Sequence, residues 1–212
     1  MDTFDISVKR FDEFASAYAE KFKIVDAYRP SIDRFCDLIV GNKPGILELG
    51  CGPGNVSQYI KNKFPDSEYI AVDLAPNMID IAKQQVKGVD FMVMDVRKIS
   101  TFNTKFDAIM CSFCLPFLSK SDTYKLITDC ADRLKENGAI YISTMEGDES
   151  KAGFETTSFS GDSEIYFNYH KQKDIEKALL ENGFIIEGFT RQDYVESDGS
   201  VLIDMIFTGI KK

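Results

Sequence analysis

The chain has 212 residues, of which 44% are hydrophobic and 28% charged, an ordinary composition for a soluble globular protein with a buried core. Its formal net charge of −9 argues against nucleic acid and against a membrane surface as partners, because both are bound through clustered lysine and arginine side chains. The five cysteines form no even set of pairs, which predicts reduced thiols in a cytoplasmic protein.

No targeting segment, membrane span or metal site is expected. The first residues lack the basic and apolar regions of a signal peptide, and the longest apolar-rich run, 106–118, is too short to cross a bilayer. Cys111 and Cys114 form a C-x-x-C pair, but no helix starts at the first cysteine, which disfavours a redox role. With one histidine and no second cysteine pair, the chain has no metal-ligand pattern.

The N-terminal segment is predicted to be helical. Aromatic and small apolar residues recur at helical spacing from Phe11 to Val25, and a second helix follows Pro30. Residues 41–44 contain glycine and proline, which break the chain before the first strand.

The middle of the chain alternates strands with helices. Strands are predicted at 46–49, 69–73, 90–94, 106–111 and 139–145. Helices are predicted at 55–63, 76–86 and 120–135. This alternation indicates an α/β fold in which a parallel sheet carries helices on both faces.

The pattern changes after this region. Residues 146–163 combine glycine, serine and threonine with isolated aromatic residues, which indicates a long loop or a small excursion from the core. A short strand is expected at 165–169 and a helix at 172–182. Two further strands are expected at 184–191 and 200–210.

The most informative motif is a glycine loop between the first strand and the first helix of this alternation. Gly50, Gly52 and Gly54 follow the apolar run 46–49, and Asp73 ends the next strand. Glycines at such a bend permit positive φ angles and close approach of a ligand to the backbone. A carboxylate at the end of the second strand can accept hydrogen bonds from both ribose hydroxyls. The pattern therefore predicts a pocket for a nucleoside.

The glycine spacing separates two classes of nucleoside cofactor. A dinucleotide fingerprint, G-x-G-x-x-G, would place its third glycine at position 55, where this chain has Asn55. The chain instead resembles the class I S-adenosylmethionine-dependent methyltransferases, in which a (Glu/Asp)-x-Gly-x-Gly-x-Gly loop contacts the methionine part of the cofactor. Residues 48–54 match that loop position by position, and the resemblance covers about residues 40–145.

The resemblance implies a fold and its subdivision. The expected fold is a Rossmann-like, doubly wound sheet of seven strands, mostly parallel with one antiparallel strand, with helices on both faces. Within a single domain of residues 1–212, the resemblance implies four parts: an N-terminal helical lid (1–40), a cofactor-binding core (41–145), a variable acceptor-side insertion (146–170) and a C-terminal helix with strands that complete the sheet (171–212).

The resemblance also implies which residues bind S-adenosylmethionine and its product S-adenosylhomocysteine. Glu48 is expected to hold the amino-acid part, Asp73 the ribose, and Asp95 the adenine amino group. The other expected contacts come from the lid, the loop and the strand ends: Tyr18, Gly50, Cys51, Gly52, Gly54, Leu74, Met78, Val96, Cys111 and Ser112. Structural alternatives stay open, namely a plain tight turn for the glycines, a helix N-cap for Asp73 and core packing for Met78 and the N-terminal aromatic residues.

The chemistry expected of such an enzyme is an in-line displacement at a sulfonium, with a small molecule as methyl acceptor. Because the leaving group is already activated, orientation of the acceptor supplies much of the catalysis. If the acceptor is a hydroxyl or an ammonium, a general base would help, and His170 is the candidate, with a structural role as its alternative. Four aromatic residues are expected to line the acceptor pocket: Phe154, Phe159, Tyr166 and Tyr169.

Three other functions are left open by the sequence. A nucleotide-dependent oxidoreductase could share this sheet, a non-catalytic module could bind the same cofactor or its product, and the acceptor could be protein or RNA. No nucleic-acid or membrane partner is expected, and the chain is expected to be a monomer or a homodimer.

Overall fold

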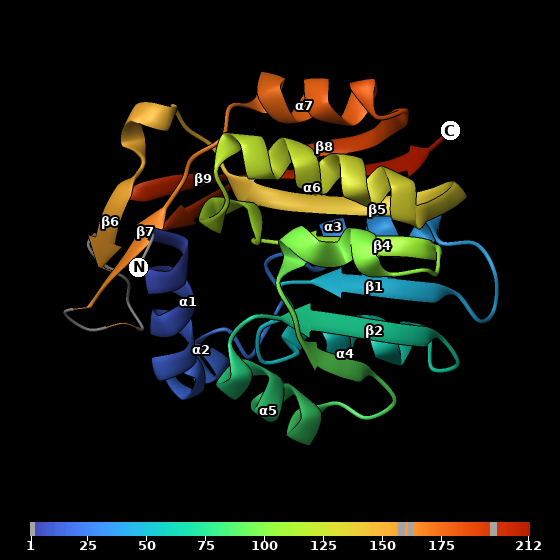
Figure 1. Ribbon diagram of the computed structural model, residues 1–212, viewed down its shortest axis with the longest axis horizontal. Helices are drawn as coiled ribbons and strands as arrows, with labels where there is room; N and C mark the ends of the chain where they lie inside the picture. Colours follow the sequence, from blue (N-terminus) through green and yellow to red (C-terminus); the bar gives the residue numbers. More distant parts are fainter. Residues whose placement is uncertain (1–2, 157–159, 161–162, 196–198) are drawn as a thin grey trace.

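A seven-stranded sheet forms the centre of this computed structural model, which describes residues 3–156, 160, 163–195 and 199–212 (Figure 1). Its strands, in chain order, are β1 (Gly45–Leu49), β2 (Glu68–Asp73), β3 (Asp90–Val93), β4 (Phe106–Ser112), β5 (Leu134–Met145), β8 (Phe184–Val195) and β9 (Val201–Lys211).

The strand order across the sheet is β3-β2-β1-β4-β5-β9-β8. The first five of these strands are parallel neighbours, and β9 pairs antiparallel with both β5 and β8. The expected fold class, with one antiparallel strand placed between its neighbours, is therefore confirmed. The order reverses between β1 and β4, and ligands of such sheets bind beyond the carboxyl ends of the strands at this reversal.

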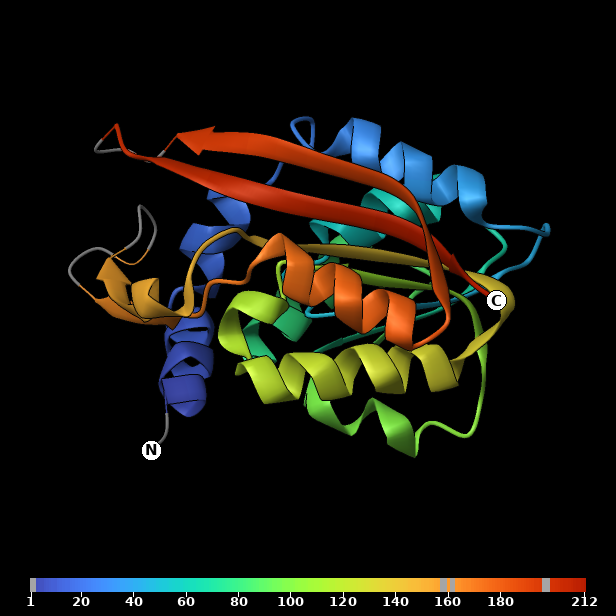
Figure 2. The same cartoon turned by 90° about the horizontal axis from the view of Figure 1, so that it is seen from above.

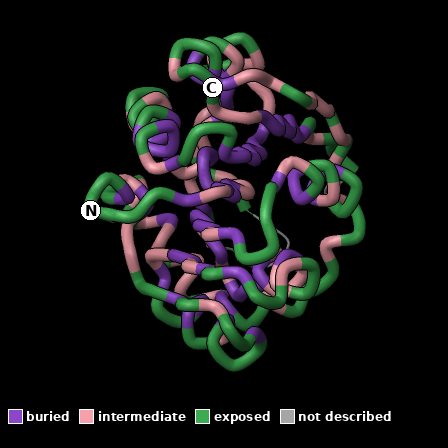
Figure 3. The backbone as a smooth tube through the Cα atoms, turned by 90° about the vertical axis from the view of Figure 1, so that its right-hand side faces the viewer, coloured by how far each residue is buried: buried purple, intermediate pink, exposed green. Residues whose placement is uncertain are grey.

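Helices cover both faces of the sheet (Figure 2). One face packs against α3 (Arg29–Leu38), α4 (Asn55–Lys63) and α5 (Pro76–Gln85). The other face packs against α6 (Lys120–Arg133) and α7 (Gln172–Glu181). Buried residues follow the central strands and the inner sides of these helices, whereas the turns that lead into the parallel strands are mostly exposed (Figure 3).

The N-terminal segment differs from the single helix predicted for it. It forms α1 (Thr3–Glu13) and α2 (Ala15–Lys21), which are separated at Phe14, where φ is −102° and ψ is 17°. The helical region thus begins earlier and ends earlier than the apolar periodicity indicated. Both helices lie across the carboxyl ends of the parallel strands, in blue at the left of Figure 1.

The variable segment forms a small second sheet beside α1. Its strands, β6 (Gly153–Thr156) and β7 (Glu164–Phe167), pair antiparallel, and β6 lies where a loop or small excursion was expected. Three short 3-10 helices occur at strand ends: η1 (Val96–Thr101), η2 (Leu115–Phe117) and η3 (Glu149–Lys151).

Most other boundaries lie within a few residues of the predicted ones. The exceptions are β5, which starts at Leu134 rather than at 139, and β8, which continues to Val195 rather than to 191. In β5 the irregular point is Asn137, with φ of +60°, which lies between the helix predicted to end at 135 and the strand predicted to start at 139. In the part of the chain that the structure describes, no helix combines the length and the apolarity needed to span a bilayer.

Candidate functional site

The glycine loop leads from β1 into α4 at the carboxyl edge of the sheet. Gly50, Gly52 and Gly54 have φ angles of +66°, +53° and +89°. Such angles strain residues that carry a Cβ atom, so glycine is required here for the loop conformation itself. At Gly54 a Cβ would also lie 3.2 Å from the Cβ of Ala82 in α5, and glycine lets the two helices approach. The loop backbone therefore faces the space beyond the strand ends.

Asp73, at the end of β2, is bonded to this loop. Its Oδ2 accepts a hydrogen bond from the Gly52 N–H at 2.9 Å, and its Oδ1 accepts one from the Ala75 N–H at 2.9 Å. Burial raises the pKa of Asp73, and the bonds from these N–H groups partly counter that effect. Each carboxylate oxygen has a second lone pair, so the side chain can still accept hydrogen bonds from a ligand.

Glu48 is the deepest carboxylate of the site, with a relative exposure of 1%. Its Oε2 accepts hydrogen bonds from the Ser57 hydroxyl at 2.5 Å and from the Tyr69 hydroxyl at 2.8 Å. Burial raises the pKa of Glu48 to about 7, although these two bonds favour the ionised form. Because Oε1 has neither of these donors, it can receive a donor from the cavity.

Asp95 and Val96, after β3, have different positions relative to the cavity. The Arg97 guanidinium bonds both carboxylate oxygens of Asp95, with its Nη2 at 2.7 Å from Oδ2. Burial alone would raise the pKa of Asp95, but the bonds from Arg97 outweigh it and hold that pKa below its usual range. Among the described residues Val96 lines the cavity and Asp95 does not, so the expected adenine contact of Asp95 stays a prediction.

The loop after β4 closes the site from the other side. Ser112, Phe113 and Cys114 line the cavity, whereas Cys111 is buried behind it. Phe113 has a φ of +52°, which is unusual for an aromatic residue, and its N–H donates to the Ser143 hydroxyl at 3.0 Å. A hydrogen bond to Cys111 and burial both raise the pKa of the Cys114 thiol, which keeps it protonated.

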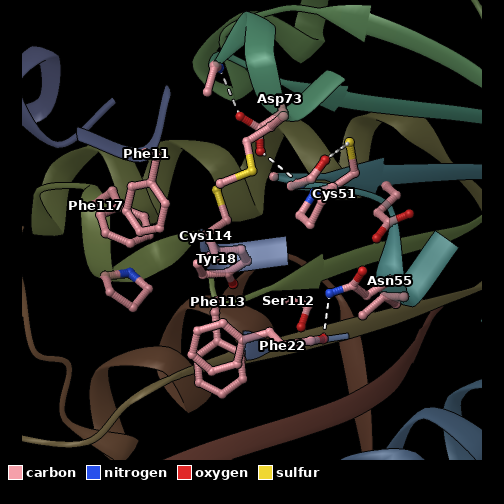
Figure 4. A pocket seen from close by; sticks show the side chains of 18 of the residues that line it. Phe11, Tyr18, Phe22, Cys51, Asn55, Asp73, Ser112, Phe113, Cys114 and Phe117 are labelled. Atoms are coloured by element: carbon pink, nitrogen blue, oxygen red, sulfur yellow. Dashed lines mark hydrogen bonds between the residues drawn. The ribbon is translucent and has the colours of Figure 1, made fainter. Parts of the chain in front are cut away.

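The N-terminal helices cover this region. Tyr18 packs edge-on against Phe11, with ring centroids 5.5 Å apart, and lies 4.6 Å from the ring of Phe22 (Figure 4). The Asn55 amide, at the start of α4, donates to the Phe22 carbonyl at 2.5 Å. A second tie joins the Asn77 N–H to the carboxylate of Asp12 at 2.7 Å. Hydrogen bonds therefore connect the N-terminal helical segment to α4 and to α5.

These elements enclose a cavity of about 280 Å³. Most of the residues expected to bind the cofactor line it: Tyr18, Glu48, Gly50, Cys51, Gly52, Asp73, Leu74, Met78, Val96 and Ser112. Gly54, Asp95 and Cys111 are not among the described lining residues. Met78 is 1% exposed and also packs against Ala15 and Ala75, so its core role and its cavity position coexist.

His170 lies away from this cavity. It is 5% exposed, and its Nε2 is 3.0 Å from the Leu115 carbonyl. Burial lowers the pKa of His170, which favours the neutral ring that donates to this carbonyl. In this position the side chain holds the η2 turn, and its expected role as general base has no support from the geometry.

The described aromatic residues that were expected around the acceptor, Phe154, Tyr166 and Tyr169, do not line this cavity. Phe154 and Tyr166 pack against each other with ring centroids 5.2 Å apart, and Tyr169 donates to the Glu155 carboxylate. Of the described residues in that segment, Phe167 lines the cavity. Phe159 lies outside the described residues.

The sequence reasoning missed the wall that comes from the C-terminal hairpin. Tyr194 in β8 and Leu202 and Asp204 in β9 line the cavity. Asp204 is 3% exposed, and the hydroxyl of Tyr28 donates to its Oδ2 at 2.7 Å. The available signal was a single carboxylate within the apolar run 201–207.

Comparisons with known proteins indicate a methyltransferase domain. A family profile described as Methyltransferase domain matches residues 46–138. The demethylmenaquinone methyltransferase of Thermotoga maritima is 31% identical over 110 residues, which are 51% of this chain and 47% of that protein. The malonyl-acyl-carrier-protein O-methyltransferase of Bacillus anthracis is 29% identical over 144 residues, covering 67% of this chain and 51% of that protein. The chain spans about half the length of these relatives.

A solved structure has the same architecture. The magnesium protoporphyrin IX methyltransferase of Synechocystis PCC 6803 with bound SAH gives a TM-score of 0.71 at 18% identity, and the match covers 100% of both chains. At this identity the likeness establishes the fold.

Proposed function

The chain belongs to the class I S-adenosylmethionine-dependent methyltransferase family, and from this premise we propose that it transfers a methyl group to a small-molecule acceptor. The observation that carries the proposal is the bond between the Gly52 N–H and Asp73, which joins the glycine loop of β1 to the carboxylate of β2 in one cavity wall. A loop of bare backbone beside an anionic side chain suits the methionine and ribose parts of S-adenosylmethionine.

The residues present fit this cofactor. Asp73 would accept from the ribose hydroxyls with the lone pairs that its backbone bonds leave available, and Glu48 would accept from the amino group of the methionine part. Leu74, Met78 and Val96 supply apolar surface for the adenine ring. Tyr18, above the loop, supplies an aromatic face that a sulfonium charge tolerates.

The protein's contribution to the chemistry is orientation and exclusion of water. When bound, S-adenosylmethionine supplies a methyl carbon whose bond to sulfur breaks with both electrons going to sulfur. The lid helices and the loop after β4 cover the cavity, so an acceptor held there is kept in line with the methyl group and away from solvent. Orientation of this kind is worth roughly 7–11 kcal/mol.

The covered cavity also favours a small acceptor over a macromolecule. Hydrogen bonds of Asn55 and Asn77 hold α1 and α2 over the cavity. A folded protein or RNA would therefore have to displace these helices to reach the glycine loop. A small molecule has to enter only by local opening of the lid.

Binding is tested by calorimetry with S-adenosylhomocysteine, S-adenosylmethionine and NAD. We expect the first two to bind and NAD not to bind, and a ligand at a hundred times its dissociation constant to add about 2.7 kcal/mol of stability. Asp73→Ala should weaken binding about tenfold or more, whereas Asp80→Ala, which removes an exposed carboxylate of α5, should not. Saturation by NAD alone would refute the proposal.

Turnover is tested by release of S-adenosylhomocysteine from S-adenosylmethionine. The low-molecular-mass fraction and the macromolecular fraction of a cell extract are supplied separately as acceptors. We expect release with the first fraction only. Release with the second alone would identify a protein or RNA acceptor, and tight binding with no release in either would identify a non-catalytic module.

A further inference from the structure

Among the residues that the structure describes, the cavity wall carries carboxyl groups and no positive side chain. Glu48, Asp73 and Asp204 line it, and among the described lining residues none is lysine, arginine or histidine. The stretches 1–2, 157–159, 161–162 and 196–198 contain none of these residue types either. A carboxylate or phosphate on the acceptor would therefore enter without a counter-charge, which is costly in a buried site.

In the proposed complex Glu48 and Asp73 bind the cofactor. Asp204 lies too far from the glycine loop along the edge of the sheet to share that role. Asp73 ends β2 and Glu48 lies in the neighbouring β1, where the cofactor would bind. Asp204 in β9 pairs with Met145 at the end of β5, and β9 is three strands from β1 in the order β1-β4-β5-β9. At about 4.8 Å per strand, β9 lies roughly 14 Å across the sheet from β1, which leads into the glycine loop.

Aromatic residues share the cavity wall with this carboxylate. The Tyr28 hydroxyl bonds Asp204, and the ring of Tyr28 packs edge-on against Phe113 with centroids 5.2 Å apart. Tyr194 lines the same end of the cavity from β8. Ring faces carry partial negative charge and attract cations, most strongly where water is excluded. A carboxylate combined with several rings is a surface suited to an ammonium group.

We propose that the methyl acceptor is an elongated amine whose protonated ammonium group binds Asp204 between Tyr28, Phe113 and Tyr194. An ammonium nitrogen has no lone pair, so the atom that attacks the methyl group is a second, uncharged nucleophile at the other end of the acceptor. Its lone pair forms the bond to the methyl carbon while the pair of the carbon–sulfur bond goes to sulfur, and the proton that the nucleophile carried is released to water after the transfer. The two groups are separated by roughly 10 Å or less, because the acceptor extends from β9 toward the loop after β4. This inference rests on the proposed function and adds the substrate class.

The test compares acceptor analogues that differ only in charge. Three matched sets serve as probes: tyramine, tyrosol and 4-hydroxyphenylacetate; serotonin, 5-hydroxytryptophol and 5-hydroxyindole-3-acetate; and 6-aminohexanol, 1,6-hexanediol and 6-hydroxyhexanoate. Their dissociation constants are measured by calorimetry on protein saturated with S-adenosylhomocysteine. In at least one set the amine should bind about tenfold or more tighter than its alcohol and its acid, the size expected for a hydrogen-bonded charge.

Variants identify the carboxylate responsible. Asp204→Asn should abolish the preference for the amine, whereas Asp193→Asn, a matched change at an exposed position of the same hairpin, should retain it. Because the wild-type comparison needs no variant, a folding defect in Asp204→Asn leaves the test intact.

The failures are distinguishable. If S-adenosylhomocysteine does not bind, the proposed function itself is wrong. If S-adenosylhomocysteine binds, three results would show that the ammonium site alone is wrong. The acids bind as tightly as the amines, no amine binds at about 10 mM, or a folded Asp204→Asn variant keeps the preference for the amine.

Discussion

Replacing Glu48 with glutamine should remove a pH dependence from cofactor binding. Burial raises the pKa of this carboxyl from 4.5 to about 7 in the unliganded protein, so near neutral pH much of it is protonated. In the proposed complex the amino group of the ligand favours the ionised form. Ligand binding is then coupled to loss of a proton from Glu48.

The magnitude follows from the ionised fraction. With a pKa of about 7, that fraction rises about tenfold between about pH 6 and about pH 8, and the dissociation constant of S-adenosylhomocysteine should fall by the same factor. The unliganded stability should change in the opposite direction. Because the folded pKa lies above the unfolded one, stability is lost as the pH rises from about 4.5 to about 7, by about 3 kcal/mol in all and by about 1 kcal/mol between about pH 6 and about pH 8.

The assay is calorimetry at both pH values, in two buffers of different ionisation enthalpy so that proton release is measured directly. Urea unfolding without ligand measures the stability change. Glu48→Gln should give nearly equal affinities at both pH values and should not lose stability over this range. Glu68→Gln, an exposed change at the start of β2, serves as control. Equal wild-type affinities at both pH values, or an unchanged pH dependence in Glu48→Gln, would refute the reasoning.

Three further changes test the loop, the strand end and the buried histidine. Asp73→Asn loses one of two backbone hydrogen bonds, because an amide has one oxygen, and urea unfolding without ligand should show a loss of about 1.5–3 kcal/mol. Gly54→Ala places a Cβ at φ of +89° against α5 and should cost about 1–3 kcal/mol, seen as a lower Tm. His170→Asn should lower Tm through loss of the bond to Leu115 and leave kcat within about tenfold, whereas a fall of 10²–10⁴ would identify a general base. Since burial lowers its pKa, His170 in the wild type should cost stability as the pH falls below 6.5, and His170→Asn should not show this loss.

The cofactor side of the site was accessible to sequence reasoning because its parts are local. The strand predicted at 46–49 and the helix predicted at 55–63 correspond to β1 and α4, and the glycines between them have the positive φ angles that their spacing indicated. The strand, the glycine bend and the helix follow one another within residues 46–63, so the pattern that encodes them is local. Asp73 follows as the end of the next strand, so the position of the pocket could be derived from the sequence.

Other features depend on contacts that local patterns do not report. The helical periodicity of the N-terminal segment continues through Phe14, so it gives no sign of the break between α1 and α2. Asp95 has the expected place at the end of β3, but Arg97, two residues further on, occupies both of its carboxylate oxygens. His170 is the candidate general base in the sequence because it is the one histidine. Its contact with Leu115 depends on a fold that brings together residues 55 positions apart.

The acceptor side is assembled from residues distant in the sequence, which explains why a family resemblance predicts the cofactor and not the acceptor. Tyr28 and Asp204 are 176 positions apart and meet because α3, which follows Tyr28, packs against β9. The burial of Asp204 depends on the antiparallel register of β9 with β5, since a shift of one residue would turn its side chain to the opposite face. The proposed ammonium site implies that a chain with the same glycine loop and another residue at this register keeps the cofactor pocket and binds a different acceptor.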